Sequence, residues 1–157
     1  MGEFSHIDNN GKAKMVDISE KGASRRRAVA VASVSMEPTT LEKIKKGEMK
    51  KGAVLETARV AAIMAIKRTC ELIPMCHQLL LTGIDVRFEF YDEKTIKIKA
   101  IVKNTGKTGV EMEALTGVSI AALTVYDMCK AVDKKMVIGD IKLMEKTGGK
   151  SGNFIRE

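Results

Sequence analysis

Two acids and a lysine share one face of the otherwise apolar segment 110–132. At about 100° per residue of helix, Glu113, Thr116, Thr124 and Asp127 lie within about 80° of one another, and Lys130 lies beside them. Asp127 and Lys130 are three residues apart, so their side chains can form an ion pair. Such a stripe is typical of a solvated helix face, but acids beside a lysine can also transfer protons. Both interpretations stay open at this point.

The two acids of this stripe are far apart along the helix. Glu113 and Asp127 are separated by fourteen residues, which corresponds to about 21 Å along a straight helix. They cannot serve one small-molecule site within a single straight helix. If both serve one pocket, two subunits must build it, so the spacing favours an intersubunit site.

Two glycine-rich segments carry lysines. Segment 104–109 contains Gly-Lys-Thr, but the first glycine of a P-loop would fall at Ile101, so that motif fails. The segment still opens onto the N-terminus of the expected helix, where N–H groups and the helix dipole attract anions. Segment 146–152 repeats the composition. Both segments favour phosphate binding, with a flexible solvated tail as the alternative for the second.

His77 follows Ile73-Pro74 in a short segment with two cysteines. A lone loop histidine is often structural, so its role stays open. Cys70, Cys76 and His77 contain neither CxxC nor HxxxH spacing, and no metal site is predicted. With Cys129 the cysteine count is odd, and the polar N-terminus carries no secretory signal, so we expect free thiols in a reducing cytosol.

Composition limits the architecture that must position these residues. The 157 residues carry a net charge of +7 and are 45% hydrophobic, but only 4% aromatic and without Trp. This predicts one domain, 1–157, with an aliphatic core, and the basic balance favours anionic partners. The longest leucine run, 79–81, is too short to span a membrane.

Apolar periodicity predicts four strands, one helical connection made of two helices, and one long helix. The strands cover 28–36, 84–91, 96–102 and 136–144. The connection consists of helices over 41–48 and 53–71, and the long helix covers 110–132. The order β-α(α)-β-β-α-β predicts an α+β, ferredoxin-like split βαβ fold, in which helices cover one face of a four-stranded antiparallel sheet. Residues 1–27 and 147–157 are expected to be flexible. The uncovered sheet face favours oligomerisation.

Three motifs resemble the MoaC family, the cyclic pyranopterin monophosphate synthases of molybdenum-cofactor biosynthesis. They are KTGVEMEALT at 107–116, LTVYDMCKAV at 123–132 and IPMCH at 73–77. Residues 5–8, 15–18 and 146–152 are similar as well. The resemblance therefore covers nearly the whole chain in order.

The resemblance implies a phosphorus–oxygen lyase. Its substrate is 3′,8-cyclo-7,8-dihydroguanosine 5′-triphosphate, supplied by an upstream radical SAM enzyme, and its products are cyclic pyranopterin monophosphate and pyrophosphate. The steps are proton and phosphoryl transfers, so no cofactor is required, and Mg²⁺ accompanying the triphosphate is left open. The resemblance also implies a cytoplasmic hexamer, a trimer of dimers with intersubunit active sites, and no nucleic-acid or membrane partner.

The resemblance also assigns residues. Lys51 and Lys130 form the central acid/base pair, for which lysines of lowered pKa are suited, and Asp127 orients Lys130. The substrate-binding residues are His77, Glu111, Met112, Glu113, Arg26, Lys67, Lys146 and Lys21. Of these, His77 and the two glutamates would bind the base or relay protons, and Arg26, Lys67 and Lys146 would hold the triphosphate. Glu111 points away from Glu113 on an ideal helix, so the helix is expected to begin near Glu111.

Two positions depart from the family pattern, and two other functions stay open. Ala53 stands where the family usually has Asp, and Gln78 where it usually has Pro. The first removes a carboxylate near Lys51, and the second loosens the His77 loop. A non-catalytic nucleotide-binding module would explain the basic charge and glycine loops. An RNA-binding domain would stack bases on sheet aromatics, but Phe88 and Phe90 fall on the inward side of their strand.

Overall fold

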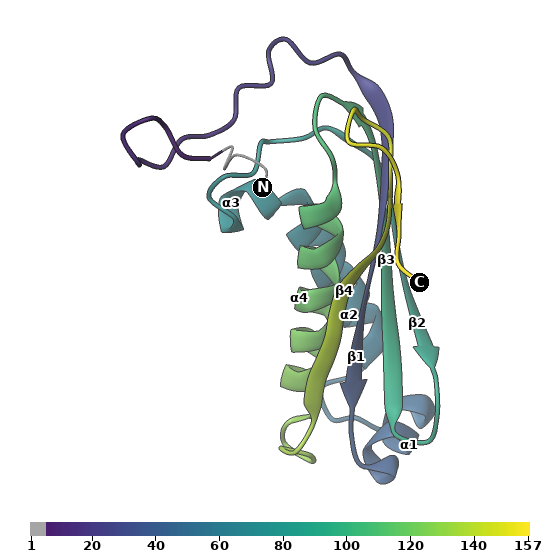
Figure 1. Cartoon of the computed structure of the whole chain (residues 1–157). Helices are drawn as coiled ribbons and strands as arrows, with labels where there is room; N and C mark the ends of the chain where they lie inside the picture. Colours follow the sequence, from purple (N-terminus) through teal and green to yellow (C-terminus); the bar gives the residue numbers. More distant parts are fainter. Residues whose placement is uncertain (1–5) are drawn as a thin grey trace.

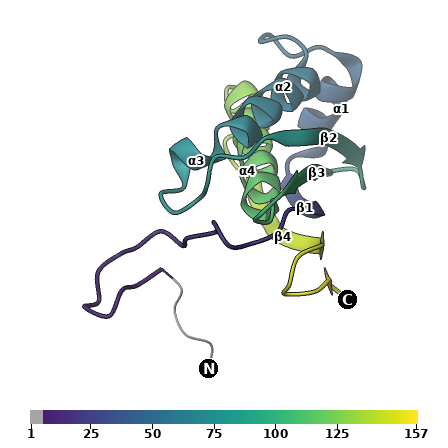
Figure 2. The ribbon, with the colours of Figure 1, turned by 90° about the horizontal axis from the view of Figure 1, so that it is seen from above.

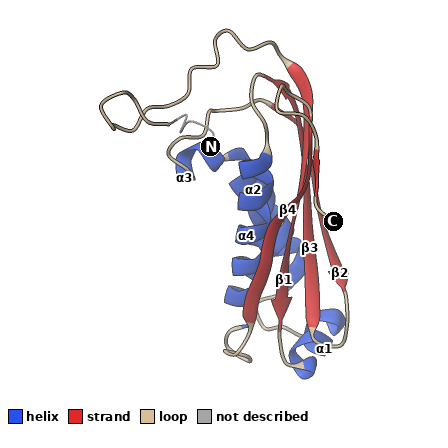
Figure 3. Ribbon diagram, in the orientation of Figure 1, coloured by secondary structure: helices blue, strands red, loops and turns tan. Residues whose placement is uncertain are grey.

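The computed structural model describes residues 6–157 as a sheet with helices on one of its faces (Figures 1 and 3). In chain order the elements are β1 (Ser24–Ser35), α1 (Pro38–Lys46), α2 (Val54–Lys67), α3 (Thr69–Leu72), β2 (Leu81–Phe90), β3 (Thr95–Gly106), α4 (Glu111–Cys129), β4 (Val137–Thr147) and β5 (Phe154–Ile155). The strand order is β2-β3-β1-β4-β5, and every pairing is antiparallel. The first four strands have the order expected of the ferredoxin-like fold, so the fold class is confirmed, and the short β5 is an addition to it.

The core lies between the sheet and the two long helices α2 and α4, which lie side by side on the same face (Figure 2). On β1 the residues facing the helices are small, namely Ala28, Ala30, Ala32 and Val34, and all are buried. Alanines of α2 and α4 are buried against them. A Cβ on Gly117 of α4 would lie 2.5 Å from Cδ1 of Ile66 on α2, so the two helices approach each other closely at this point. The aliphatic core expected from the composition is confirmed.

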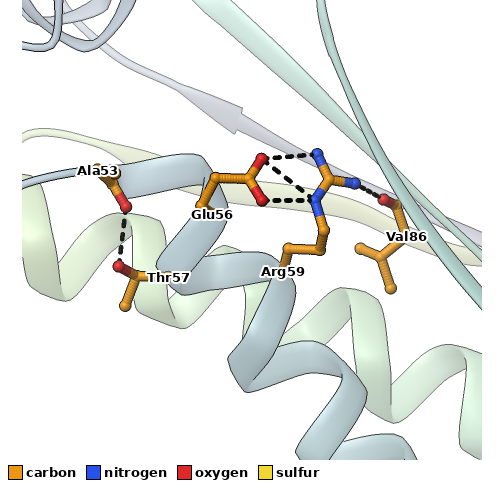
Figure 4. Close-up of polar contacts among 5 residues, drawn as sticks. All are labelled: Ala53, Glu56, Thr57, Arg59 and Val86. Carbon is orange, nitrogen blue, oxygen red and sulfur yellow. Dashed lines mark hydrogen bonds and ion pairs between the residues drawn. The ribbon is translucent and has the colours of Figure 1, made fainter.

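The start of α2 is fastened to the edge strand β2 (Figure 4). The Arg59 guanidinium pairs with the Glu56 carboxylate at 3.1 Å and donates a hydrogen bond to the Val86 carbonyl. Thr57 Oγ1 donates to the Ala53 carbonyl at 2.8 Å. The first turn of α2 therefore holds its position on the sheet through side chains.

The alternative of an RNA-binding domain would need aromatic side chains on the open face of the sheet. Phe88 packs against the core on the helix side of β2, and the Arg59 guanidinium lies 5.2 Å from the centre of its ring. The Lys45 ammonium lies 5.2 Å from the centre of the Phe90 ring. Because Phe88 faces the helices, the sheet does not present the aromatic platform on which RNA-binding domains of this topology stack bases.

Several element boundaries differ from the expected ones. The helix expected over 53–71 is divided at Arg68 into α2 and α3. β1 begins at Ser24, because residues 24–27 pair with β3, so the last four residues of the segment 1–27 belong to a strand. Residues 1–5 of that segment lie outside the described residues. The tail expected to be flexible contributes β5, which pairs with Glu145 and Lys146 of β4.

α4 determines where the chemistry can lie. It begins at Glu111, as expected from the opposed directions of Glu111 and Glu113, and continues to Cys129. Figure 1 shows its first turn near α3 and the β4–β5 turn, and its last turn near the end that carries α1. Within residues 6–157, no helix is long and apolar enough to cross a membrane.

Candidate active site

The C-terminal end of α4 carries a cluster of three charged side chains, Lys51, Asp127 and Lys130, here called the Lys51 cluster. Lys51 lies in the loop between α1 and α2, and its Nζ is 3.1 Å from Asp127 Oδ2 and 3.0 Å from the Asp127 carbonyl oxygen. Lys130 Nζ is 2.8 Å from Asp127 Oδ1. Each carboxylate oxygen therefore binds a different ammonium group, and all three side chains remain exposed to solvent.

These contacts shift the pKa values of Asp127 and Lys130 in opposite directions. The hydrogen bond from Lys130, followed by that from Lys51, lowers the pKa of Asp127 below its usual value. The same bond from the Asp127 carboxylate raises the pKa of Lys130. The expectation of a lowered lysine pKa is therefore wrong for Lys130 in the single chain, because its partner is an anion. Lys130 is held as an ammonium ion that can donate a proton.

A second group of predicted residues surrounds the N-terminal end of α4. A cavity of about 430 Å³, here called the His77 cavity, is lined by His6, Val16, Ile18, Lys21, Met75, Cys76, His77, Leu79, Thr108, Gly109, Glu111, Met112 and Glu113. His77 Nε2 lies 2.8 Å from the Val16 carbonyl oxygen, which ties the extended segment before β1 to this end of the helix. The His77 cavity therefore contains His77, Lys21, Glu111, Met112 and Glu113 of the predicted set.

Glu113 is the most deeply buried acid of this cavity. Only 4% of the Glu113 residue is exposed to solvent. Burial raises the pKa of Glu113 to about 7, and the neighbouring Glu111 adds to the shift. Burial, followed by the charge of Glu113, likewise raises the pKa of Cys76. A carboxyl group with a pKa near 7 can both accept and donate a proton at neutral pH.

A second cavity of about 600 Å³ adjoins the first and shares Lys21, Thr108, Gly109 and Glu111 with it. It is called the Arg26 cavity, and its other lining residues are Gly22, Ala23, Ser24, Arg26, Lys107, Lys146, Gly149, Lys150 and Ser151. Five basic side chains face one acid, so the cavity attracts anions. The first turn of α4 has no side-chain cap, which leaves N–H groups of the helix N-terminus beside both cavities.

Glycines and one ion pair shape the Arg26 cavity. Arg26 Nε donates to the Gly106 carbonyl at 3.0 Å. Gly149 has φ +86°, and a Cβ there would lie 2.1 Å from Arg26 Nη1, so a side chain at this position would displace the guanidinium. Lys146 Nζ lies 3.1 Å from Glu111 Oε1, so the carboxylate of Glu111 forms an ion pair with one of the basic side chains of this cavity.

Of the three residues predicted to hold the triphosphate, Lys67 is the one that does not line the Arg26 cavity. It lies at the C-terminal end of α2, where it lines an open cavity with Leu79, Leu80 and Ile84. It also borders a narrow gap with His77 and Glu113, but it does not line the Arg26 cavity with Arg26 and Lys146. The chain therefore gathers the predicted residues at two ends of α4 that are separated by the fourteen residues from Glu113 to Asp127, about 21 Å.

Comparison with known proteins identifies the family. The model of the MoaC family matches residues 15–149. The chain belongs to the MoaC family. Among similar relatives, a cyclic pyranopterin monophosphate synthase of Natranaerobius thermophilus is 61% identical over 156 residues, covering 99% of this chain and 98% of that protein. Proteins of the same name from Desulfitobacterium hafniense and Brevibacillus brevis are 60% and 58% identical, covering 99% and 98% of this chain and 95% and 96% of theirs.

The motifs that carried the MoaC resemblance lie at both ends of α4. Residues 107–116 form the loop and first turn beside the two cavities, 73–77 form the wall that holds His77, and 123–132 carry Asp127 and Lys130. The departure at Ala53 lies at the N-cap of α2, which makes no side-chain capping bond. The position of Gln78 is one residue beyond His77, outside both cavities.

Other residues lie in the site without having been assigned there. Lys107 lines the Arg26 cavity, and its Nζ donates to the Ser19 carbonyl at 2.8 Å. The glycine-rich segment 104–109 that contains it had already indicated phosphate binding, although the resemblance assigned no role to Lys107 itself. Ser24 also lines this cavity, and its Oγ is buried without a hydrogen-bond partner within the described residues. Nothing in the sequence around Ser24 indicates that position. Within residues 6–157, His, Cys, Asp and Glu side chains form no group of three or more that could hold a metal ion.

Proposed function

We propose that the protein converts 3′,8-cyclo-7,8-dihydroguanosine 5′-triphosphate to cyclic pyranopterin monophosphate and pyrophosphate, in molybdenum-cofactor biosynthesis. The observation that carries the proposal is the pair of adjoining cavities at the N-terminal end of α4. One is strongly basic and the other contains a histidine and a carboxyl group of raised pKa. A nucleotide has the same division, with an anionic chain at one end and a hydrogen-bonding base at the other. The relatives named cyclic pyranopterin monophosphate synthase support the same reaction.

In this proposal the Arg26 cavity binds the triphosphate. Arg26, Lys146 and Lys21 supply positive charge, and the N–H groups at the start of α4 add hydrogen-bond donors. The substrate's phosphates compete with the Glu111 carboxylate for Lys146, so the charge of Lys146 remains paired before and after binding. A ribose-derived hydroxyl then attacks the α-phosphorus, and the bond to the β-phosphate oxygen breaks to release pyrophosphate.

The base lies in the His77 cavity, where its five-membered ring is opened and the pterin ring is closed. Glu113 and His77 bind the base or relay protons, because they line this cavity and Glu113 has a pKa near 7. Met112 lines the cavity as an apolar wall. The Lys51 cluster supplies the acid/base pair, and Asp127 orients both lysines by binding one with each oxygen.

One copy of the chain cannot bring the Lys51 cluster to these cavities, since about 21 Å of helix separates them. We therefore propose a homo-oligomer, a hexamer built as a trimer of dimers, in which the Lys51 cluster of one copy completes the cavities of another. Lys67, which lines neither main cavity of its own chain, would reach the triphosphate of a neighbouring copy. The exposed apolar side chains of α2, Val60 and Met64, are available to such an interface.

The remaining parts of the proposal follow from the reaction. Proton and phosphoryl transfers need no redox cofactor, and Mg²⁺ would enter only with the triphosphate. The substrate comes from an upstream radical SAM enzyme. The protein acts in the cytoplasm, where the free thiols of Cys70, Cys76 and Cys129 persist, and it needs neither a nucleic-acid nor a membrane partner.

A turnover assay with the cyclised guanosine triphosphate tests the function. Pyrophosphate release and pterin formation are followed for the parent chain, Lys51→Ala and Lys130→Ala, with Lys94→Ala in the β2–β3 turn as a control for loss of a lysine. We expect turnover by the parent and the control, and loss of at least about a hundredfold in kcat for the two cluster variants. A parent chain that binds the triphosphate and returns it unchanged would instead support the non-catalytic nucleotide-binding module.

A further inference from the structure

Asp133 is a buried carboxylate in the turn between α4 and β4, and only 5% of the residue is exposed. Each of its oxygens binds a different part of the chain. Oδ2 accepts the Glu37 N–H at 2.8 Å and the Thr40 hydroxyl at 3.2 Å. Oδ1 accepts the Lys135 N–H at 2.9 Å. One carboxylate thus joins the start of α1 to the turn after α4.

On the α1 side, Asp133 performs the task of a helix cap. Glu37 occupies the N-cap position of α1 and makes no side-chain capping bond of its own. Asp133 instead holds this end of the helix by accepting the N–H of the N-cap residue and the Thr40 hydroxyl in its first turn. α1 then leads through Gly47, which is left-handed and closes the helix, into the loop that presents Lys51. The position of α1 therefore fixes where the Lys51 loop begins.

On the α4 side, Asp133 closes the turn that carries Lys130. The Asp133 N–H donates to the Cys129 carbonyl at 3.1 Å, and the Tyr126 hydroxyl donates to the Lys134 carbonyl at 3.2 Å. With the bond from Lys135 to Oδ1, the turn is held on both sides. Lys130 is the first residue after α4, so its side chain extends from a turn whose shape these hydrogen bonds hold.

The buried thiol of Cys129 lies near both groups. Burial, followed by the charge of Asp133, raises the pKa of Cys129 to about 11, against the opposing effect of the Lys51 charge. Lys135 is the other cation near Asp133, and Asp127 faces the two lysines from α4. The charges of Asp133 and Lys51 therefore both act on Cys129, the last residue of α4.

We propose that Asp133 is a positioning residue, which sets the separation of Lys51 and Lys130 around Asp127 by joining the two segments that carry them. It touches neither cavity and acts only through these lysines. Its effect on turnover rests on the proposed function. Its effect on the geometry of the cluster does not, because Asp127 itself reports that geometry.

The variant Asp133→Asn tests the proposal with two measurements on the full chain. The amide keeps the shape of the carboxylate, but it can accept hydrogen bonds on one side only, so either α1 or the turn after α4 loses its partner. Carboxyl ¹³C NMR titration, with Asp127 assigned through Asp127→Asn, gives the pKa of Asp127. We expect that pKa to rise by about half a pH unit or more, because Lys51 or Lys130 moves away. We expect kcat to fall about tenfold or more, with KM within about twofold.

Two further substitutions keep the test decisive. If Asp133→Asn does not fold, Thr40→Val removes one hydrogen bond to Oδ2, while Thr40→Ser retains it. We expect the Asp127 pKa to move in the first and not in the second. Asp92→Asn is the matched control, because Asp92 also accepts a backbone N–H in a turn, at 2.9 Å from Lys94, but lies in the β2–β3 hairpin.

The outcomes separate the two proposals. An unchanged Asp127 titration in a folded Asp133→Asn protein, or in both Thr40 variants, overturns the positioning role. A shifted Asp127 titration in a protein whose parent form shows no turnover supports the positioning role and rejects the proposed reaction. A shift of equal size in Asp92→Asn would also overturn it, since the effect would then not depend on the junction of α1 and α4.

Discussion

The protein places two carboxyl groups in opposite environments at the ends of one helix. Asp127 is exposed and bound by two ammonium groups, so its pKa is lowered, whereas Glu113 is buried, so its pKa is raised to about 7. The first is an ion that orients its partners, and the second is an acid that can exchange a proton near neutral pH. Environments that move the pKa values of two carboxyl groups apart are characteristic of acid/base sites.

The raised pKa of Glu113 predicts how stability depends on pH. Between about pH 4.5 and 7 the native protein binds this proton more readily than the unfolded chain does. The contribution of Glu113 to the free energy of unfolding is therefore most favourable below pH 4.5. As the pH rises through 7 this contribution is lost, which lowers the free energy of unfolding by at most about 3 kcal/mol. Glu113→Gln stays neutral, so its free energy of unfolding should exceed that of the parent at pH 8 and match it at pH 4.5. Urea unfolding over this range measures both.

The matched control for this experiment is Glu89→Gln, at an exposed position on β2. It changes the same charge by the same chemistry without changing a buried group. If Glu113→Gln and the parent keep a constant difference in unfolding free energy from pH 4.5 to 8, the burial argument for Glu113 is contradicted.

At the residue scale the sequence indicated most of the site. The stripe, the glycine loops and the family motifs identified residues that line the two cavities and form the Lys51 cluster. Asp133 and Ser24 could not be predicted from the sequence, because neither belongs to a periodic or recognisable local pattern. The partners of Asp133 on α1 are more than ninety residues away in the chain, and only the tertiary fold brings them together.

At the scale of elements, the start of α2 carries an unused stabilising position. Ala53 is its N-cap, and no side chain accepts the free N–H groups of the first turn. Asp or Asn at this position should supply that acceptor and raise the free energy of unfolding by about 1 kcal/mol. Only Ala53→Asp also adds a negative charge two residues from Lys51. We therefore expect both substitutions to stabilise the protein, and only Ala53→Asp to change the pH profile of kcat.

Chemical denaturation and pH–rate profiles of the two Ala53 variants check this expectation. Ala53→Asn serves as the uncharged control. Two variants with equal stability and equal pH profiles would show that position 53 acts as a cap alone. If neither is more stable than the parent, α2 begins in a different way from the one described.

The β4–β5 turn offers a second comparison between matched positions. Gly149 and Gly152 both have positive φ, +86° and +73°, so alanine strains the backbone at either one. Only at Gly149 would the added Cβ collide with Arg26, since nothing lies within 4 Å of it at Gly152. Gly149→Ala should therefore raise KM for the triphosphate about tenfold relative to Gly152→Ala, the cost of one charge-assisted hydrogen bond. Steady-state kinetics on both variants measures this, and equal KM values would contradict a phosphate role for Arg26.

Periodicity predicted the elements better than it predicted their ends. The hairpin of β2 and β3 has a clear alternation of apolar residues, and α4 is a long apolar segment with a polar stripe, and both were identified. The first four residues of β1, Ser-Arg-Arg-Arg, have no such repeat, and their strand conformation comes from pairing with β3. The break between α2 and α3 falls at Lys67-Arg68-Thr69, where neither proline nor glycine marks the end of a helix, so the sequence did not reveal it. The backbone leaves helical geometry at Arg68.

At the scale of the whole molecule, the continuous helix α4 is the central fact. It carries proton-transfer candidates at both ends, about 21 Å apart, while the residues proposed to bind one substrate are divided between those ends. The fold thus separates within one chain what the reaction needs together. We propose that copies associate so that each site takes one end of α4 from each of two copies.

Complementation between inactive variants tests this claim most directly. Lys130→Ala removes a group from the Lys51 cluster, and Lys146→Ala removes one from the Arg26 cavity. The two chains are co-expressed with different tags and isolated together. If every site combines ends from two copies, random assembly should leave about a quarter of the sites intact and restore about a quarter of the parent kcat. Lys130→Ala with Asp127→Asn is the control, because both lie at the same end and no site should recover. Mixed oligomers of the first pair that remain as inactive as each variant alone would contradict the intersubunit site.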